Sequence, residues 1–115
     1  MSEEELDEVV GLLDDEYARD ILAATSIEPM SAETLAERCD ASLPTIYRRV
    51  KRLREADLLA AETQVDPDGH HYDRYSARLE TVTVRLVDGR YEIEVDRVER
   101  DAADRFTELV EGLQR

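Results

Sequence analysis

Apolar residues recur with helical spacing through the first part of the chain. Residues 3–13 place them three and four positions apart, which predicts a short amphipathic helix, and a second such pattern follows. Asp14 or Asp15 can cap the second helix, and Pro29 marks the end of its connection. The apolar positions of the two helices are Leu6, Val9, Val10 and Leu13, then Tyr17, Ile21 and Leu22.

Two further helical patterns follow, separated by a short break. Ser31 is placed to cap the first and Ser42 the second, and Asp40-Ala41 forms the break between them. Pro44 fits the first turn of the second helix, where its missing N–H does no harm. The expected inner positions are Leu35, Ala36 and Cys39, then Leu43, Ile46, Val50 and Leu53. Two helices joined by so short a turn predict a helix-turn-helix.

The pattern then changes to the alternation of β-strands. Residues 61–65 and 71–77 predict a hairpin around the turn-forming residues 66–69. A second hairpin surrounds Asp88-Gly89, because Asp-Gly favours a two-residue type I′ turn. Its expected register places Leu86 opposite Tyr91, Val84 opposite Ile93, Val82 opposite Val95, Arg85 across from Glu92 and Thr83 across from Glu94.

A last helical pattern runs from residue 101 to residue 113. Its apolar positions are Phe106, Leu109, Val110 and Leu113. The order of elements predicts an α+β fold, a winged helix-turn-helix with an additional C-terminal β-hairpin and helix. We expect residues 1–78 to form the winged helix-turn-helix, and residues 79–115 to form a packing or dimerisation extension of the same domain.

The charge of the chain is unusual in size and in type. Among 115 residues, 29 Asp and Glu oppose 15 basic residues, so the formal net charge is -14. Lys51 is the only lysine. Many carboxylates with almost no lysine are typical of proteins from salt-in halophiles, because at molar salt the Debye length is about 3 Å and self-repulsion is weak. An acidic protein of an ordinary high-GC organism is the alternative.

Against this background, residues 43–54 (LPTIYRRVKRLR) carry five basic side chains and no acidic one. With about 100° per residue, the apolar positions share one side of the helix. The opposite side carries Pro44, Thr45, Arg48, Lys51 and Arg52, and the flanks carry Arg49 and Arg54. An apolar anchor with a cationic outer face predicts a helix that enters the major groove of DNA. A solvated face that pairs with the chain's own carboxylates is the alternative.

The N-terminal part of such a helix reads bases. This favours Thr45 and Arg48 as base readers, whereas basic residues further along the helix suit phosphates. Free N–H groups next to Ser42 offer a further phosphate site. The full set of expected DNA-binding residues is Ser42, Pro44, Thr45, Arg48, Arg49, Lys51, Arg52 and Arg54, with His70 and Arg74 on the first hairpin.

The segment SAETLAERCDASLPTIYRRVKRLREADLL resembles the core of winged helix-turn-helix transcription regulators of the ArsR-like class, and its acidity looks similar to that of regulators from halophilic archaea. The resemblance covers residues 15–78 and rests on Ser31, Leu35-Ala36, Ser42, Thr45-Ile46, Arg48, Val50, Leu53 and Leu58-Leu59. It implies a recognition helix at residues 42–57 and a β-wing at residues 60–77 that reaches the minor groove or the backbone.

The chain departs from this class at two positions. Metal-sensing members have two cysteines in the helix before the recognition helix, whereas this chain has Cys39 alone, so thiolate metal sensing is not expected. Asp57 stands where the class often ends the helix with Gly or Asn, residues that adopt the left-handed conformation more readily.

The remaining reactive side chains have simpler interpretations. Cys39 is expected to be a small core side chain rather than a redox sensor. His70 and His71, near Asp66 and Asp68, are expected on an exposed wing rather than in a metal site. The sequence has no Ser-His-Asp order and no glycine-rich phosphate loop, and it predicts no enzyme, no cofactor and no metal.

Taken together, these patterns predict a cytoplasmic, sequence-specific regulator of transcription that binds double-stranded DNA, without a membrane span or signal peptide. A winged-helix interaction module of the transcription machinery is the alternative. We expect a homodimer, because helix-turn-helix proteins commonly meet half-sites about 34 Å apart. The interface would use one of the terminal helices, through Leu6, Val9, Val10 and Leu13 or through Phe106, Leu109, Val110 and Leu113.

Overall fold

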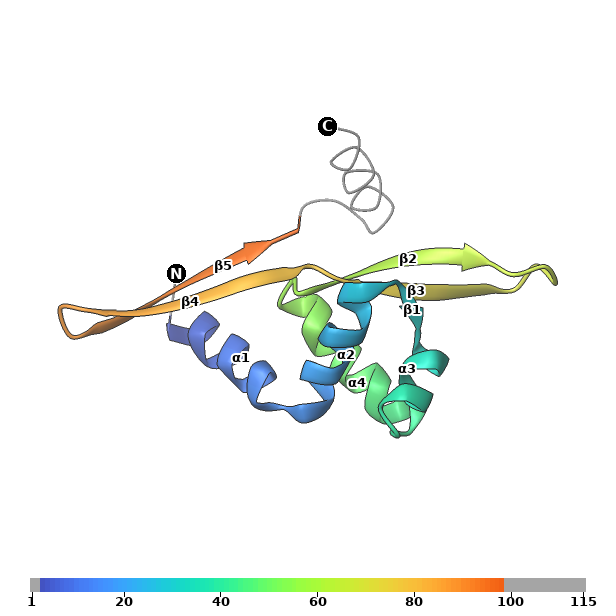
Figure 1. Cartoon of the computed structure of the whole chain (residues 1–115), viewed down its shortest axis with the longest axis horizontal. Helices are drawn as coiled ribbons and strands as arrows, with labels where there is room; N and C mark the ends of the chain where they lie inside the picture. The colour runs from blue at the N-terminus through green and yellow to red at the C-terminus, as the bar shows by residue number, and fades with distance from the viewer. Residues whose placement is uncertain (1–2, 99–115) are drawn as a thin grey trace, which may run out of the picture.

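The computed structural model of the chain describes residues 3–98. They form, in order, α1 (Glu3–Asp14), α2 (Glu16–Ile27), β1 (Met30–Ser31), α3 (Ala32–Arg38), α4 (Leu43–Glu55), β2 (Leu59–Val65), β3 (His71–Ala77), β4 (Leu79–Val87) and β5 (Arg90–Arg97). The helices gather on one side, and the β2–β3 and β4–β5 hairpins extend from them in opposite directions (Figure 1). The predicted α+β fold, a winged helix-turn-helix followed by a second hairpin, is confirmed. The predicted helix with Phe106, Leu109, Val110 and Leu113 lies outside the described residues.

Polar side chains fix where the helices begin. Asp15, Ser31 and Ser42 each cap a helix by accepting a hydrogen bond from the amide three residues later, at 3.1, 3.2 and 3.3 Å. The two serine caps are as predicted, and of the two candidate aspartates Asp15 is the cap. The stretches after α3 and α4 turn through Asp40 and Asp57, whose φ angles of 50° and 59° are left-handed. Asp57 therefore adopts the conformation for which Gly or Asn is the usual choice.

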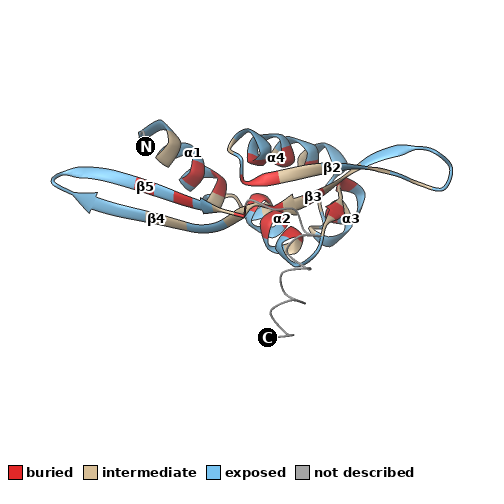
Figure 2. Cartoon of the chain, turned by 90° about the horizontal axis from the view of Figure 1, so that it is seen from above, coloured by how far each residue is buried: buried red, intermediate tan, exposed pale blue. Residues whose placement is uncertain are grey.

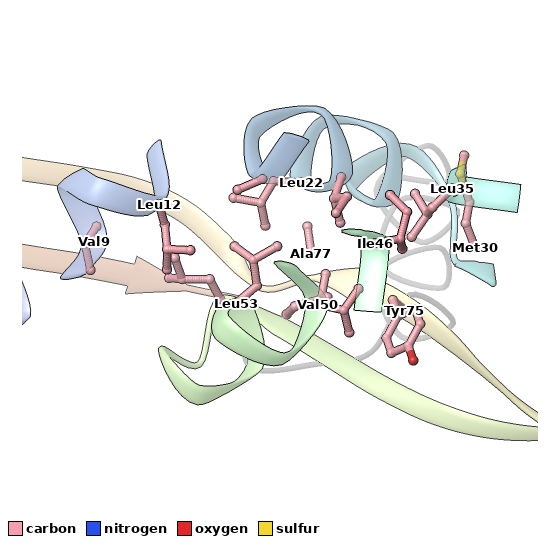
Figure 3. Close-up of a cluster of buried hydrophobic side chains, with 14 of the residues drawn as sticks. Val9, Leu12, Leu22, Met30, Leu35, Ile46, Val50, Leu53, Tyr75 and Ala77 are labelled. Atoms are coloured by element: carbon pink, nitrogen blue, oxygen red, sulfur yellow. The ribbon is translucent and has the colours of Figure 1, made fainter. Parts of the chain in front are cut away.

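The core lies where helices α1 to α4 meet one face of a three-stranded sheet of order β1–β3–β2, and it extends to Ile93 and Val95 of β5. Its largest fully buried side chains include Leu12, Ile21, Leu35, Ile46, Leu53 and Leu58. Side chains from several helices and from the sheet converge there, and the hydroxyl of Tyr75 points away from the cluster (Figure 3). Among residues 3–98 no helix is long and apolar enough to cross a membrane.

Two predicted core positions are wrong. Val10 is 47% exposed, and α1 buries Leu12 together with the predicted Val9, because it contacts β5 as well as α2. Leu43, at the first residue of α4, is 37% exposed, so the buried stripe of that helix begins at Ile46. Dimerisation through α1 stays a prediction; with Val9 buried, Val10 is the most exposed of its four apolar positions.

The two hairpins belong to separate sheets. In the first, β3 pairs with β2 on one side and with the short β1 on the other. The second contains β4 and β5 alone, and its predicted register is confirmed: Leu86 is opposite Tyr91, Val84 opposite Ile93, Val82 opposite Val95, Arg85 opposite Glu92 and Thr83 opposite Glu94. Asp88 and Gly89 both have positive φ, 51° and 78°, as a type I′ turn requires.

Two arginines fasten the second hairpin to the C-terminal end of α4. Arg97 donates to the main-chain oxygens of Ala56, at 3.1 Å, and Asp57, at 2.8 Å. Arg78 contacts the Asp57 carboxylate and donates to the Val98 oxygen at 3.1 Å. Because Arg97 satisfies carbonyl oxygens at the C-terminal end of α4 and Arg78 holds the Asp57 carboxylate, the hairpin and that helix form one unit.

Candidate nucleic-acid interface

Helix α4 presents its two faces as the sequence predicts. Ile46, Val50 and Leu53 are at most 3% exposed and anchor the helix to the core. The opposite face is exposed at Pro44, Arg48, Lys51 and Arg52, and Arg54 on the flank is exposed as well. Thr45 and Arg49 are half-buried. A rigidly anchored helix with a basic outer surface has the form that fits a major groove.

Three of the predicted DNA-binding residues form a hydrogen-bonded row at the start of α4. The hydroxyls of Ser42 and Thr45 are 3.0 Å apart, and Arg48 Nη2 donates to the Thr45 hydroxyl at 3.2 Å. The row follows the helix axis, because residues three apart are neighbours on a helix surface. It orients the guanidinium of Arg48 toward the N-terminal end of the helix, where base contacts are made in helix-turn-helix docking.

Arg49 has a partner inside the protein that the sequence did not predict. Its Nε lies 2.6 Å from the Asp15 carboxylate, and its guanidinium lies 5.9 Å from the centre of the Tyr17 ring. Burial alone would raise the pKa of Asp15, but hydrogen bonds from the Ala18 amide and from Arg49 outweigh it and lower the pKa below its usual value. The pair therefore joins α4 to the start of α2, and contact of Arg49 with DNA stays a prediction.

Lys51 and Arg52, further along α4, are more accessible to a ligand than Arg49 is. Lys51 Nζ is 4.0 Å from Glu55, and its side chain remains 78% exposed. The side chain of Arg52 is exposed and makes no hydrogen bond or ion pair with any other residue in the range 3–98. Exposed cations without strong internal partners can neutralise phosphates when a polyanion approaches.

The wing residues occupy two different places. His70 is at the tip, with its side chain 80% exposed and Nδ1 3.6 Å from the Asp66 carboxylate. Arg74 is half-buried in the middle of β3, opposite Ser31 of β1 and Glu62 of β2. The structure therefore does not bring these two predicted contacts together. Residues 59–77 also carry four carboxylates against one arginine, so at low salt their charge opposes contact with phosphates.

Three possible metal ligands lie close together at the tip of the wing, and the hydrogen bonds of the turn explain why they do. Ligand atoms of Asp66, Asp68 and His70 lie within 4.8 Å of one another. However, Oδ1 of Asp66 already accepts hydrogen bonds from the amides of Asp68 and His70, at 2.9 and 2.8 Å. An aspartate in this position is the ordinary way to close such a turn.

An open groove of about 960 Å³ separates the wing from α4 and the start of α3. Its wall includes three tyrosines, of which Tyr47 is 53% and Tyr72 is 42% exposed. The sequence did not single out either residue as functional. Tyr47 stands between the buried Ile46 and the exposed Arg48, and an exposed aromatic beside basic residues was the available signal. Both hydroxyls can donate to phosphate oxygens.

Cys39 and Tyr75 keep their protons at neutral pH. Burial, together with the negative charge of Asp20, raises the pKa of the Cys39 thiol, and the thiolate is the reactive form of cysteine. Burial, together with the charge of Asp73, likewise raises the pKa of Tyr75. Neither group has the lowered pKa that nucleophilic chemistry requires.

Residues 13–61 match a protein family model described as a helix-turn-helix domain. The matched segment is similar to that family. It runs from the end of α1 to the start of β2, and it contains α3, the turn and all the predicted DNA-binding residues of α4. The domain supports a DNA-binding regulator of transcription. No curated protein matches the chain.

Proposed function

We propose that this chain is a non-enzymatic, sequence-specific transcription regulator that binds double-stranded DNA with α4 in the major groove. The observation that carries the proposal is the row of Ser42, Thr45 and Arg48 on the exposed basic face of a helix-turn-helix domain. The row supplies oriented donors at the end of the helix that meets base edges.

The side chains along α4 take different roles. Arg48 pairs bidentately with guanine, and Thr45 contacts an adjacent base. Lys51, Arg52 and Arg54 bind phosphates and set the depth of the helix in the groove. The exposed His70 makes the contact at the tip of the wing, and Tyr47 adds a phosphate contact beside Arg48.

The protein acts as a homodimer in molar salt, as an ArsR-like regulator of a halophile would. The net charge of -14 disfavours both self-association and DNA binding at low salt. At molar salt this repulsion is screened, but counterion release also contributes little to affinity. Recognition then depends on directional contacts and on DNA shape, so the geometry of Arg48 matters more than its charge.

Binding to genomic duplex fragments at molar KCl tests the proposal. Arg48→Ala should weaken binding to selected sites by about 10-fold or more, because a bidentate base contact contributes about 1–3 kcal/mol. Arg48→Lys should restore little of this loss. Arg52→Ala should weaken selected and unselected sequences equally, because phosphates carry no sequence information.

Arg49→Ala is the matched control within the same helix. Its side chain is held by Asp15, so the variant should lose thermal stability while its preference among duplex sequences is unchanged. Absence of duplex binding by the wild type at every salt concentration would rule the proposal out. The basic helix would then be assigned to an acidic protein of the transcription machinery.

A further inference from the structure

The β4–β5 hairpin is covered unevenly. Helix α1 contacts β5, where Ile93 and Val95 are 5% and 9% exposed. Beyond α1 the same apolar face is open, and Val84, Leu86 and Tyr91 are 47%, 65% and 54% exposed. Within residues 3–98, β4 has no strand partner other than β5. A two-stranded sheet is marginal in water, and further strands stabilise it, so the unpaired edges of this hairpin are places where a partner strand can add.

The two outer edges of the hairpin differ in charge. The β5 edge carries Glu92, Glu94 and Asp96, so pairing of β5 with β5 of a second copy would set carboxylates against carboxylates. The β4 edge has the sequence TVTVRLV at residues 81–87, in which Arg85 is the only charge. A weakly charged edge rich in β-branched residues, with no proline or glycine, is a template for another strand.

We propose that β4 pairs antiparallel with β4 of a second copy, so that two chains share a four-stranded sheet of order β5–β4–β4–β5. Centred on Val84, the pairing sets Val84 opposite the partner's Val84 and Val82 opposite the partner's Leu86. Arg85 then faces the partner's Thr83. All apolar side chains stay on one face of the joint sheet.

Neighbouring registers are less favourable. A shift of the two-fold axis by half a residue sets valine opposite threonine and mixes the apolar and polar faces. A shift of the axis to Arg85 sets that residue against its own copy. In the register centred on Val84, the exposed Leu86 of each tip lies beside the half-buried Val82 of the other copy.

The shared sheet rests on the proposed function, in which the regulator acts as a homodimer. Its test measures the oligomeric state without DNA, so a failure of the shared sheet and a failure of DNA binding are distinguishable. Molar KCl is the appropriate solvent, because it screens the repulsion between two chains of charge -14.

Val84→Glu and Val84→Lys should each give monomers by sedimentation in molar KCl, where the wild type is a dimer, because two like charges would have to be desolvated against each other at the two-fold axis, where salt screens little. An equimolar mixture of the two variants should form heterodimers. Val65→Glu is the matched control: Val65 is 61% exposed, but it lies on β2 of the wing, and its variant should remain dimeric.

Cross-linking gives a second measurement that does not depend on repulsion. In a Cys39→Ser background, Val84→Cys should form disulfide-linked dimers on oxidation, because residues opposite each other in antiparallel strands have Cα atoms about 4.5–5.5 Å apart. Tyr91→Cys, on the outer strand β5, should not. A monomeric wild type, dimeric charge variants, or a mixture that stays monomeric would each overturn the shared sheet.

Discussion

The two hairpins are similar in length, but the wing exposes mainly polar side chains and the second hairpin exposes apolar ones. The wing, β2–β3, is joined on one side by β1, and its exposed residues are mainly polar, as at Glu62, Thr63 and His71. The second hairpin has no third strand in the described structure and exposes Val84, Leu86 and Tyr91. Both tips extend beyond the buried residues (Figure 2).

Under the two proposals above, this contrast suits one simple motif to two kinds of partner. A polar ribbon remains soluble alone and suits a hydrated groove of nucleic acid, where contacts are polar and water-mediated. An apolar ribbon suits a protein surface, because burial of apolar area is the main favourable term in protein association. The chemistry of the exposed positions, rather than the backbone, separates the two roles.

The largest effect is expected at the root of the second hairpin. Ile93 is 5% exposed where β5 contacts α1, so Ile93→Ala should lower the free energy of unfolding by about 2–5 kcal/mol. Val65→Ala on the wing, at a side chain 61% exposed, should change it by less than about 0.5 kcal/mol. Denaturant unfolding measures both. Equal losses would mean that the second hairpin is not anchored through α1.

An intermediate effect is expected at the turns. Gly69 and Gly89 have φ of 84° and 78°, and a Cβ on either would meet no atom within 4 Å. Gly69→Ala and Gly89→Ala should therefore each cost about 1–2 kcal/mol through backbone strain alone. Gly11→Ala is the control, since Gly11 is in α1 with equally open space. It should stabilise the protein by about 1 kcal/mol in thermal unfolding; a loss there would show that something packs on that side of α1.

The smallest effect is expected for the polar pairs across the strands. The Thr63 hydroxyl is 3.0 Å from Asp73 in the wing, and Arg85 is 3.9 Å from Glu94 in the second hairpin. Because both pairs are exposed, Thr63→Val and Arg85→Ala should each change the free energy of unfolding by less than about 0.5 kcal/mol in denaturant titrations. If the free energy of unfolding fell by more than about 1 kcal/mol for only one of the two variants, the polar side chains, and not only the apolar ones, would distinguish the two hairpins.

Local signals predicted the elements of this fold well. The caps at Ser31 and Ser42 and the register set by Asp88-Gly89 depend on residues close in the sequence. The apolar stripe of α4 was also predicted from Ile46 onward, because this helix packs with one face inward. Within the site, local spacing likewise brought Ser42, Thr45 and Arg48 together.

The failures have a tertiary cause. The inner face of α1 depends on two neighbours, α2 and β5, so spacing alone chose Val10 in place of Leu12. The partner of Arg49 is Asp15, which is 34 positions away, and no local pattern links a helix cap to a distant arginine. Tyr47 of α4 and Tyr72 of β3 line one groove although they are far apart in the sequence.

The attachment of Arg97 and Arg78 to the end of α4 has a consequence for the operator. If two chains join through β4, each recognition helix is held at a fixed distance and angle from the shared axis, because its end is fastened to the root of the hairpin. Such a dimer would then bind only half-sites that are separated by one particular spacing. One base pair inserted between half-sites rotates the second by about one-tenth of a turn, so the length of the spacer becomes part of the sequence that is read.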